Sequence, residues 1–413
     1  MDYCSQPELM PVAHALERMQ STVTPVTATE VVHLQAALDR VAAEPIYANL
    51  NIPSHDNSAM DGYAFAYASA STDTSMIVVG TALAGHPYNG SLGENECVRI
   101  MTGAIVPPQA DTVIMQEQVV VEDNCIRLAR VPELGENIRR AGDDIAHGTL
   151  VIDKGKRITP IDIGLLASLG VAQVTVFAPL RVAVLSTGDE LKSAGQALKP
   201  GELYDSNRQT LLALLSRLDV TVIDCGLVAD DPQKIYTAFE SAANQADVVI
   251  SSGGVSVGDA DYTKNVLTSL GAINFWKVAM KPGKPFAFGA LKKSTGNAWF
   301  FGLPGNPVSA VVTYHQLVLP VLRHLSGEQF SEELSLPVKT NHPLKKQPGR
   351  ADYQRGVLQK IDGEICVSTT GNQSSGVLSS IARANCYLVL EQDRGSVAKG
   401  ESVSVIPFNK FLL

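Results

Sequence analysis

The most regular pattern of apolar and polar positions runs from residue 181 to residue 325. Short apolar runs rich in β-branched residues alternate there with amphipathic stretches of helical period. The runs predict strands at residues 182–185, 221–225, 248–250, 273–278, 285–288 and 298–301. The stretches predict helices at residues 206–218, 232–244, 261–270 and 308–325, the first of them capped by Ser206 or Asn207. Repeated β-α units of this length predict a mostly parallel sheet with helices on both faces.

The flanking regions follow other patterns. Apolar residues at helical spacing predict helices at residues 11–20, 34–43 and 161–169. Short runs between turn residues predict strands at residues 76–79, 97–101, 112–115, 118–121, 125–128 and 171–177. Beyond residue 335, alternating runs at residues 336–339, 353–358, 365–368, 386–390 and 402–406 predict a small β-barrel or sandwich.

These patterns together predict a multidomain α/β plus β fold. A β-rich piece interrupts the N-terminal helical and extended segments, so we expect it to be an inserted domain. The expected domains are an N-terminal domain (residues 1–48 and 145–178), an inserted domain (49–144), a central Rossmann-like α/β domain (179–326) and a C-terminal β-barrel domain (327–413).

Composition and charge narrow the class of protein. The formal net charge of -9 argues against nucleic acid or an anionic membrane as the main partner. Six scattered cysteines without a Cys-x-x-Cys pair indicate reduced thiols in a cytoplasmic protein and argue against a zinc site. The first twenty residues carry Asp2 and Glu8 where a signal peptide would carry lysines. No apolar segment reaches the length needed to span a bilayer, so no membrane association is expected.

The strongest chemical signal follows the predicted strand at residues 248–250. Glycines and serines alternate there at Gly253, Gly254, Ser256 and Gly258. Glycines let backbone N–H groups approach a phosphate closely, and the carboxylates of Asp259 and Asp261 follow at once, which suits a phosphate held with a divalent cation. The alternative is a tight strand-to-helix turn in which Asp261 only caps the next helix. Three glycines and two acids exceed what a cap requires, so we favour a ligand site.

Four loops are expected at the carboxyl edge of the central sheet, where ligands of such sheets bind. They span residues 186–190, 252–261, 277–284 and 303–307, and they bring acids, three lysines and Gly/Pro turns. Taken singly, the lysine segment could be a surface hairpin and Pro304-Gly305 a rigid turn. Their convergence at one edge favours a site for a phosphorylated anion held with a metal.

Other polar positions allow two interpretations each. His55, Asp56 and Asp61 lie in a turn-rich segment. They could take part in a functional site, or they could be ordinary solvated loop residues. Arg350 and Arg355 fall in the predicted barrel, where a solvated surface and a ligand contact are both reasonable roles.

Six motifs together resemble one family. They are Asn-Ser-Ala-Met-Asp-Gly-Tyr at residues 57–63, Met-Thr-Gly-Ala at 101–104, Ser-Thr-Gly-Asp-Glu-Leu at 186–191, Gly-Gly-Val-Ser-Val-Gly at 253–258, Lys-Pro-Gly-Lys-Pro at 281–285 and Leu-Pro-Gly-Asn-Pro at 303–307. In this order, from about Pro11 to Leu413, the chain resembles the bacterial molybdopterin molybdenumtransferases (MoeA), and the catalytic domain of gephyrin is similar.

The resemblance implies a three-layer central domain of the molybdenum-cofactor biosynthesis type and a homodimer whose site is shared between chains. It assigns catalytic roles to Asp61, Thr102, Glu190, Asp230, Asp261, Lys277 and Lys281. It also implies that Pro304 and Pro307 shape their loop. With the glycine loop and the barrel included, we expect the substrate to contact Gly253, Gly254, Ser256, Gly258, Pro304, Pro307, Arg350 and Ser375. The family's Gly-Gln-Gly-Ser-like turn reads Asn-Gln-Ser-Ser at residues 372–375 here, so the departure at Ser374 leaves the role of Ser375 open.

The implied reaction inserts molybdate into adenylylated molybdopterin with Mg²⁺ and releases AMP and molybdenum cofactor. Asp261 and Glu190 are expected to bind the Mg²⁺, while Lys277 and Lys281 neutralise oxyanions. Expected partners are molybdopterin adenylyltransferase and molybdoenzyme chaperones.

Two alternative functions remain at this point. One is an adenylyltransferase or pyrophosphatase of the same superfamily, which would need neither the Asp61 region nor the barrel. The other is a gephyrin-like scaffold that binds a partner peptide with its last domain, although the intact acids and lysines argue against lost catalysis.

Overall fold

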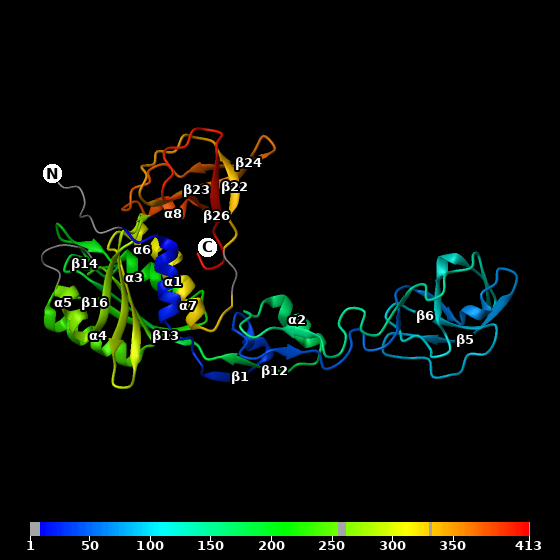
Figure 1. The fold of residues 1–413 in the computed structure, drawn as a ribbon. Helices are drawn as coiled ribbons and strands as arrows, with labels where there is room; N and C mark the ends of the chain where they lie inside the picture. Colours follow the sequence, from blue (N-terminus) through cyan, green and yellow to red (C-terminus); the bar gives the residue numbers. More distant parts are fainter. Residues whose placement is uncertain (1–8, 255–261, 330–332, 413) are drawn as a thin grey trace.

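A six-stranded sheet forms the centre of the molecule, in the computed structural model that describes residues 9–254, 262–329 and 333–412 (Figure 1). Its strand order is β16-β13-β17-β21-β20-β18. The strands are β13 (Leu180–Thr187), β16 (Val220–Val228), β17 (Val248–Ser252), β18 (Gly271–Lys277), β20 (Pro285–Lys292) and β21 (Asn297–Leu303). The first four in this order are parallel, whereas β20 runs antiparallel to both of its neighbours, β21 and β18. The mostly parallel sheet predicted from the sequence is therefore present.

Helices cover both faces of this sheet because alternate strand residues point in opposite directions. Val182 and Val184 belong to one apolar cluster, and Ala183 and Leu185 to another on the opposite face. The first face packs against α1 (Val12–Thr22), α3 (Ser206–Leu215), α6 (Pro307–Thr313) and α7 (Leu319–Leu325), and the second against α4 (Pro232–Gln245) and α5 (Tyr262–Leu270). The domain thus has the three layers expected of it.

Two details of the predicted helices were wrong. The single helix expected over residues 308–325 is interrupted by a π-helical turn, Tyr314–Val318. Pro320 has no N–H to donate to the carbonyl of Gln316, so a regular α-helix cannot continue through this point. The cap of α3 is Asp205 rather than Ser206 or Asn207, since its carboxylate accepts the backbone N–H of Arg208.

Apart from α1, which packs on the central sheet, the described part of the N-terminal domain consists of short paired strands and one further α-helix. β1 (Thr29–His33) pairs with β12 (Gln173–Phe177), β2 (Ile46–Tyr47) pairs with β11 (Leu150–Ile152), and α2 covers Pro160–Ser168. The helix predicted over residues 34–43 was wrong, because only a 3-10 turn, Leu34–Ala37, forms there. Asp39 has a φ of 61°, and the next residues, Val41 and Ala42, make β-bridges that replace the helical bonds.

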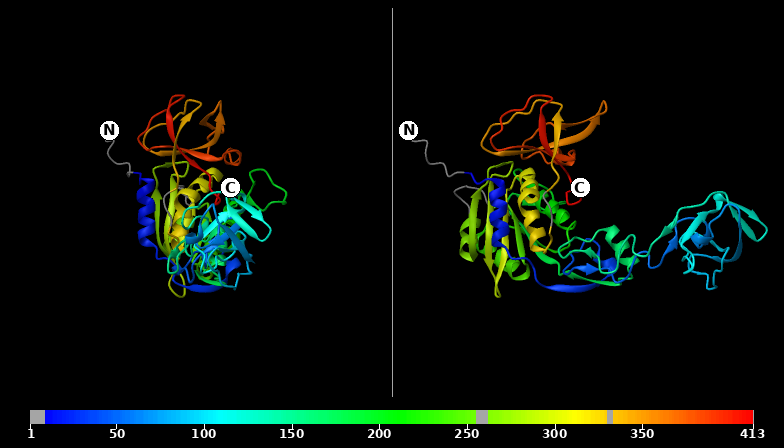
Figure 2. Two further views of the ribbon diagram at one scale, coloured as in Figure 1. Left: turned by 90° about the vertical axis from the view of Figure 1, so that its right-hand side faces the viewer. Right: turned by 45° about the vertical axis from the view of Figure 1, so that its right-hand side comes forward.

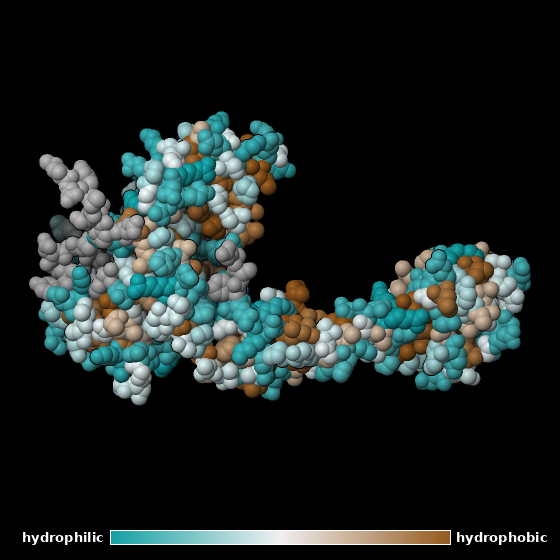
Figure 3. Space-filling view, viewed as in Figure 1, coloured by the Kyte–Doolittle hydropathy of each residue, from teal (hydrophilic) through white to brown (hydrophobic). Residues whose placement is uncertain are grey.

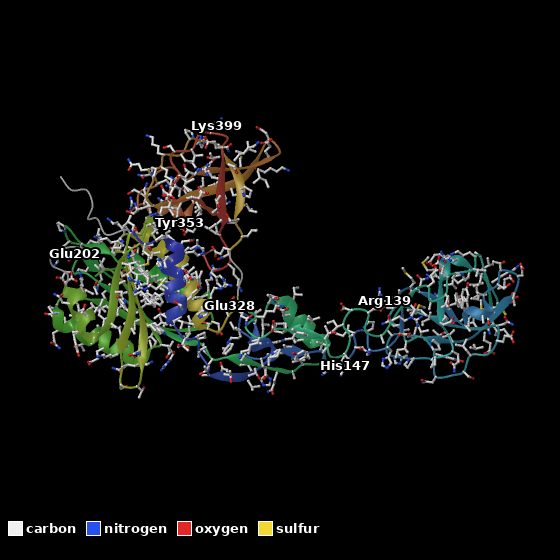
Figure 4. All side chains as sticks on the ribbon, viewed as in Figure 1. Arg139, His147, Glu202, Glu328, Tyr353 and Lys399 are labelled. Carbon is white, nitrogen blue, oxygen red and sulfur yellow. The ribbon has the colours of Figure 1, made fainter. Side chains whose placement is uncertain are left out.

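The inserted domain lies apart from the central domain, at the far end of the elongated molecule (Figures 1 and 2). Its six-stranded sheet has the order β7-β4-β6-β5-β9-β8. The strands are β4 (Gly62–Phe65), β5 (Ser75–Ala82), β6 (Glu96–Ile100), β7 (Thr112–Met115), β8 (Val119–Glu122) and β9 (Cys125–Leu128). At its base β3 (Asn57–Ser58) pairs with β10 (Ile138–Arg139). Figure 4 labels Arg139 and His147 on the segment that leads back to the N-terminal domain.

The C-terminal domain is a closed barrel, which decides between the barrel and the sandwich. Its strands are β22 (Leu336–Thr340), β23 (Ala351–Ile361), β24 (Glu364–Thr369), β25 (Cys386–Leu390) and β26 (Ser402–Pro407), followed along the ring in the order β23-β24-β22-β26-β25. The ring closes because β25 also pairs with β23. A short helix, α8 (Ser379–Ala382), lies beside it.

One strand of the central domain joins this barrel sheet. β19 (Met280–Lys281) pairs with the start of β23, so the lysine segment at residues 277–284 is a connection between domains and not a free surface hairpin. Among the described residues, no helix is long and apolar enough to cross a membrane.

Candidate functional site

The four loops predicted to converge do meet at one edge of the central sheet. Ser186 is paired with Ser252, and Ser252 with Leu303, so three of the loops begin side by side. Lys277, at the end of β18, is paired with Pro285 at the start of β20. Because β20 is antiparallel to both of its neighbours, the lysine segment reaches the same edge.

The glycine loop requires glycine at its first two positions. Gly253 has a φ of 91°, and a Cβ there would lie 2.7 Å from the carbonyl oxygen of Thr187. Gly254 has a φ of 68°, and its Cβ would lie 2.6 Å from the side chain of Thr263. The backbone N–H of Gly253 donates to the carbonyl of Leu303 at 3.1 Å. The loop therefore starts in a conformation that other residues adopt only with strain.

Ser256, Gly258 and Asp261, all predicted site residues, lie outside the described residues, as does Asp259.

Two polar residues at the start of α3 hold the loop ends. Asn207 Nδ2 donates to Ser252 Oγ and to the carbonyl of Gly305, both at 2.8 Å. Asp205 Oδ1 accepts the hydroxyl of Ser186 at 3.2 Å. Sequence reasoning considered this segment only as a helix cap and missed both ties. The polar run Asp-Ser-Asn at residues 205–207 was the one signal for them.

The acidic side of the edge consists of Asp189, Glu190 and Asp230. The backbone N–H of Asp230 donates to Asp189 Oδ1 at 3.0 Å, so the loop after β13 contacts the loop after β16. Glu190 is exposed, and its carboxylate lies over Gly188, where a Cβ would come within 2.6 Å of it.

Carboxylate oxygens are the donors that Mg²⁺ prefers, and an exposed Glu190 leaves room for the waters that this ion keeps. The donor type at this edge therefore fits magnesium. Within the described part of the chain, no group of three or more His, Cys, Asp or Glu residues forms a ready metal cluster.

A basic pocket of about 760 Å³ lies where the lysine segment meets the barrel. It brings together two predicted site residues from different domains, Lys281 and Arg350. Its lining is Lys281, Lys345, Lys346, Gln347, Pro348, Arg350, Asp352 and Ser396. Lys281 Nζ contacts Asp352 Oδ2 at 3.2 Å. Four basic residues and one acidic residue thus line the pocket, which favours an anionic ligand.

The two lysines that precede Arg350 were missed, because a Lys-Lys pair in a turn is typical of a solvated surface. Lys346 is buried instead. Its ammonium donates to the carbonyls of Gln347, Gln392 and Arg394 at 3.3, 3.1 and 2.7 Å. Burial lowers the pKa of Lys346. Lys277 is exposed where β18 ends.

The Asn-Gln-Ser-Ser turn lies over the start of α6. The carbonyl of Ser375 accepts the backbone N–H of Val308 at 3.0 Å, directly after Pro307. Arg355 holds the turn from inside the barrel, donating to the carbonyl of Ser374 at 3.3 Å and to Ser380 Oγ at 3.1 Å. Arg355 is fully buried, and burial lowers its pKa, so it is not part of a solvated barrel surface.

Asp61 and Thr102 form a pair at the other end of the molecule. Asp61 Oδ1 accepts the backbone N–H of Thr102 at 2.8 Å and its hydroxyl at 2.7 Å. These hydrogen bonds lower the pKa of Asp61. Within one chain, the inserted domain keeps this pair far from the sheet edge (Figure 1). Asp56, in the same turn-rich segment, has a structural contact with Arg140 at 2.6 Å.

Comparison with known proteins covers nearly the whole chain. Family models match for the MoeA N-terminal region (domain I and II) at residues 10–170, a probable molybdopterin binding domain at 183–324 and the MoeA C-terminal region (domain IV) at 337–408. A molybdopterin molybdenumtransferase from Haemophilus influenzae is 47% identical over 94% of this chain and 95% of its own length. The chain belongs to the MoeA family of molybdopterin molybdenumtransferases.

Further members agree with this assignment. A family member from Nostoc is 35% identical over 98% of this chain and 94% of its own length. Gephyrin from Dictyostelium discoideum is 32% identical over 91% of this chain but only 59% of its own. A crystal structure of the MoeA protein from Pyrococcus horikoshii superposes with a TM-score of 0.84 at 27% identity, covering 97% of this chain and 100% of that one. The fold predicted from the sequence is confirmed.

Proposed function

We propose that this chain is a molybdopterin molybdenumtransferase that inserts molybdate into adenylylated molybdopterin and releases AMP and molybdenum cofactor. The observation that carries the proposal is the meeting of three features at one place. A glycine loop and exposed carboxylates lie at the carboxyl edge of the central sheet, and the basic pocket includes Lys281 of the lysine segment that leaves this edge. A phosphate, a divalent cation and a second oxyanion are the ligands that such a set suits. The names of the relatives support the same reaction.

The lysines and Arg350 hold the oxyanions in this proposal. Lys281 contacts Asp352, a 3% exposed carboxylate that fixes where the ammonium lies while leaving its other hydrogens for a ligand. Arg350 offers a planar pair of donors on the barrel side of the same pocket. Lys277 adds positive charge at the end of β18. Together they stabilise negative charge that develops during cleavage of the phosphoanhydride.

Magnesium would be held by Glu190 and Asp261. The ion supplies positive charge that polarises the phosphoanhydride when it is bound. Asp230, through its backbone bond to Asp189, keeps the two acidic loops together. Gly188 leaves the space that the Glu190 carboxylate occupies.

The site is completed in a homodimer, with Asp61 and Thr102 reaching the sheet edge of the partner. Support comes from their position at the far end of an elongated chain (Figure 1). The N-terminal domain also exposes apolar side chains, with Val31 63% and Ile161 81% exposed. Figure 3 shows apolar surface over α2. Such surface is typical of a region that a second protein covers.

The proposed partners follow from the reaction. Molybdopterin adenylyltransferase supplies the substrate, and molybdoenzyme chaperones accept the product, in the cytoplasm.

One assay tests the reaction. The purified chain is mixed with adenylylated molybdopterin and Mg²⁺, with and without molybdate, and AMP is measured by chromatography. The cofactor is measured by activation of an apo-molybdoenzyme. We expect molybdate-dependent AMP release together with active cofactor, both abolished by a chelator. Equal AMP release without molybdate would indicate a pyrophosphatase, and no release with all components present would refute the proposal.

A further inference from the structure

One side chain joins two of the loops at the sheet edge. Asn207 Nδ2 donates to Ser252 Oγ and to the carbonyl of Gly305, both at 2.8 Å. One amide nitrogen carries two hydrogens, so each bond uses a different one. Gly305 offers a carbonyl oxygen, and the amide must therefore point its NH₂ group toward it. Of similarly sized side chains, aspartate has no donor for either bond.

The two hydrogen bonds of Asn207 connect β17 and β21 beyond the last residues that pair in the sheet. Pairing between β17 and β21 ends at Ser252 and Leu303. The next bond, from the N–H of Gly253 to the carbonyl of Leu303, is 3.1 Å long. Asn207 then connects Ser252 to Gly305, two residues farther along the Pro-Gly loop. The spacing of the two loops therefore depends on a residue from a third segment.

The start of α3, which carries Asn207, is itself held by several hydrogen bonds. Asp205 caps α3 and accepts both the backbone N–H and Nε of Arg208, at 3.1 and 3.0 Å. Arg208 Nη1 reaches both carboxylate oxygens of Asp224 on β16 at 2.6 Å. Ser186 donates to Asp205 from the end of β13. The start of α3 thus contacts β13 and β17 at their ends, through Ser186 and Ser252, and β16 at its middle, through Asp224. This support can fix the position of the Pro-Gly loop.

We propose that Asn207 is a positioning residue for the transferase reaction. It sets the spacing between the glycine loop and the Pro304–Pro307 loop, and so shapes the place where the adenylylated substrate sits. The inference rests on the proposed function, but it does not require Asn207 to touch the substrate.

The kinetic test compares Asn207→Ala and Asn207→Asp with a control, Asn244→Ala. Asn244 also makes two hydrogen bonds, to Glu240 and Ser294 at 3.0 Å, but at the opposite edge of the sheet. We expect both Asn207 variants to raise the KM for adenylylated molybdopterin about ten-fold or more, because misplaced loops bind the substrate poorly. The KM for molybdate should change less than about three-fold, since the basic pocket is untouched. The control should match wild type.

A double variant distinguishes loss of the hydrogen bond between Asn207 and Ser252 from a general loss of structure. Ser252→Ala removes one acceptor and should produce part of the loss. Combined with Asn207→Ala, it should add nothing further, because residues that act through one bond are not additive. A fully additive loss, or an unchanged KM with only a lower Tm, would overturn the proposal.

Amide exchange gives a readout that needs no turnover. In Asn207→Ala the N–H of Gly253 should exchange about ten-fold faster than in wild type, with exchange in α4 unchanged. Suppose that the wild type releases no AMP, but the Gly253 N–H exchanges faster in Asn207→Ala. The proposed reaction is then wrong, while the role of Asn207 in positioning the two loops is supported. If wild type releases AMP and the variants match it in KM and in exchange, only the role of Asn207 is refuted.

Discussion

The sheet edge and the inserted domain each hold a carboxylate that accepts several hydrogen bonds, Asp205 and Asp61. The first carboxylate is buried and the second is exposed. Asp205, at the sheet edge, is 5% exposed and uses both oxygens, accepting Ser186 and the Arg208 backbone at Oδ1 and the guanidinium at Oδ2. Asp61 is exposed, and both of its bonds from Thr102 go to the same oxygen, Oδ1.

This difference indicates that Asp205 has a structural role, whereas Asp61 is available to contact a ligand. A buried carboxylate must have its lone pairs satisfied, and Asp205 meets that condition within its own chain. An exposed carboxylate needs no such partners for stability, so the ordered geometry of Asp61 points to another use. The proposed homodimer supplies that use by bringing a second chain to it.

Mixing two inactive variants tests this comparison most sharply. Asp61→Ala removes the exposed carboxylate, and Lys281→Glu reverses a charge in the basic pocket. Each homodimer should be inactive, because every site carries one lesion. After the two are dissociated and reassembled together, about half of the dimers are mixed, and one of the two sites in each is intact. About a quarter of wild-type activity should return.

The same mixture also shows how the result could fail. If Asp61 served the sheet edge of its own chain, every site would keep one lesion and no activity would return. Pull-down with two different tags must first show that mixed dimers form. Continued inactivity in a sample that contains them would contradict the shared site.

Much of the sheet edge was predictable because topology alone brings it together. Parallel strands end on the same side, so the loops after β13, β17 and β21 had to meet wherever the β-α rhythm was read correctly. Gly253 and Gly254 also stand where the turn needs a positive φ, which glycine adopts without strain.

The long-range interactions at the sheet edge could not be predicted from the sequence. Asn207 lies 45 residues from Ser252 and 98 residues from Gly305, and nothing local distinguishes it from a helix cap. The pairing of β19 with β23, which brings Lys281 to Arg350, is likewise a tertiary event. Tertiary bonds also replaced the predicted helix at residues 34–43, where Val41 and Ala42 join other segments.

Stability measurements should separate the two carboxylates. Asp205→Ala removes a helix cap and leaves Nε of Arg208 without its partner in a buried place, so the free energy of unfolding should fall by about 3 kcal/mol. Asp61→Ala should leave the melting temperature nearly unchanged, because both the carboxylate and its partner are exposed. Chemical denaturation of both variants checks this. A comparable loss in the two would mean that Asp61 is structural.

The basic pocket should depend on Lys281 for binding and not for folding. Lys281→Ala is expected to raise the molybdate concentration needed for half-maximal AMP release about ten-fold, because a charged hydrogen bond to the oxyanion is lost. Thermal stability should change much less than binding, since Lys281 is 47% exposed and the buried Asp352 carboxylate keeps the hydrogen bond from Gln354 Nε2. Lys339→Ala is the matched control, as Lys339 is an exposed lysine of β22 that pairs loosely with Glu364. Equal curves for the two variants would remove Lys281 from the oxyanion site.

The smallest expected effect concerns how Thr102 prepares Asp61. The backbone N–H of Thr102, and then its hydroxyl, lower the pKa of Asp61 by bonding its ionised form. Thr102→Val keeps the N–H and removes the hydroxyl, so the pKa should rise and the acid limb of the activity profile should move to higher pH. Thr102→Ser keeps both donors and should retain the wild-type limb. Profiles of kcat/KM, each scaled to its own maximum, make the comparison independent of any loss in overall rate. A limb that moves to lower pH, or moves equally in the serine variant, would mean that the hydroxyl does not hold Asp61 in its ionised form.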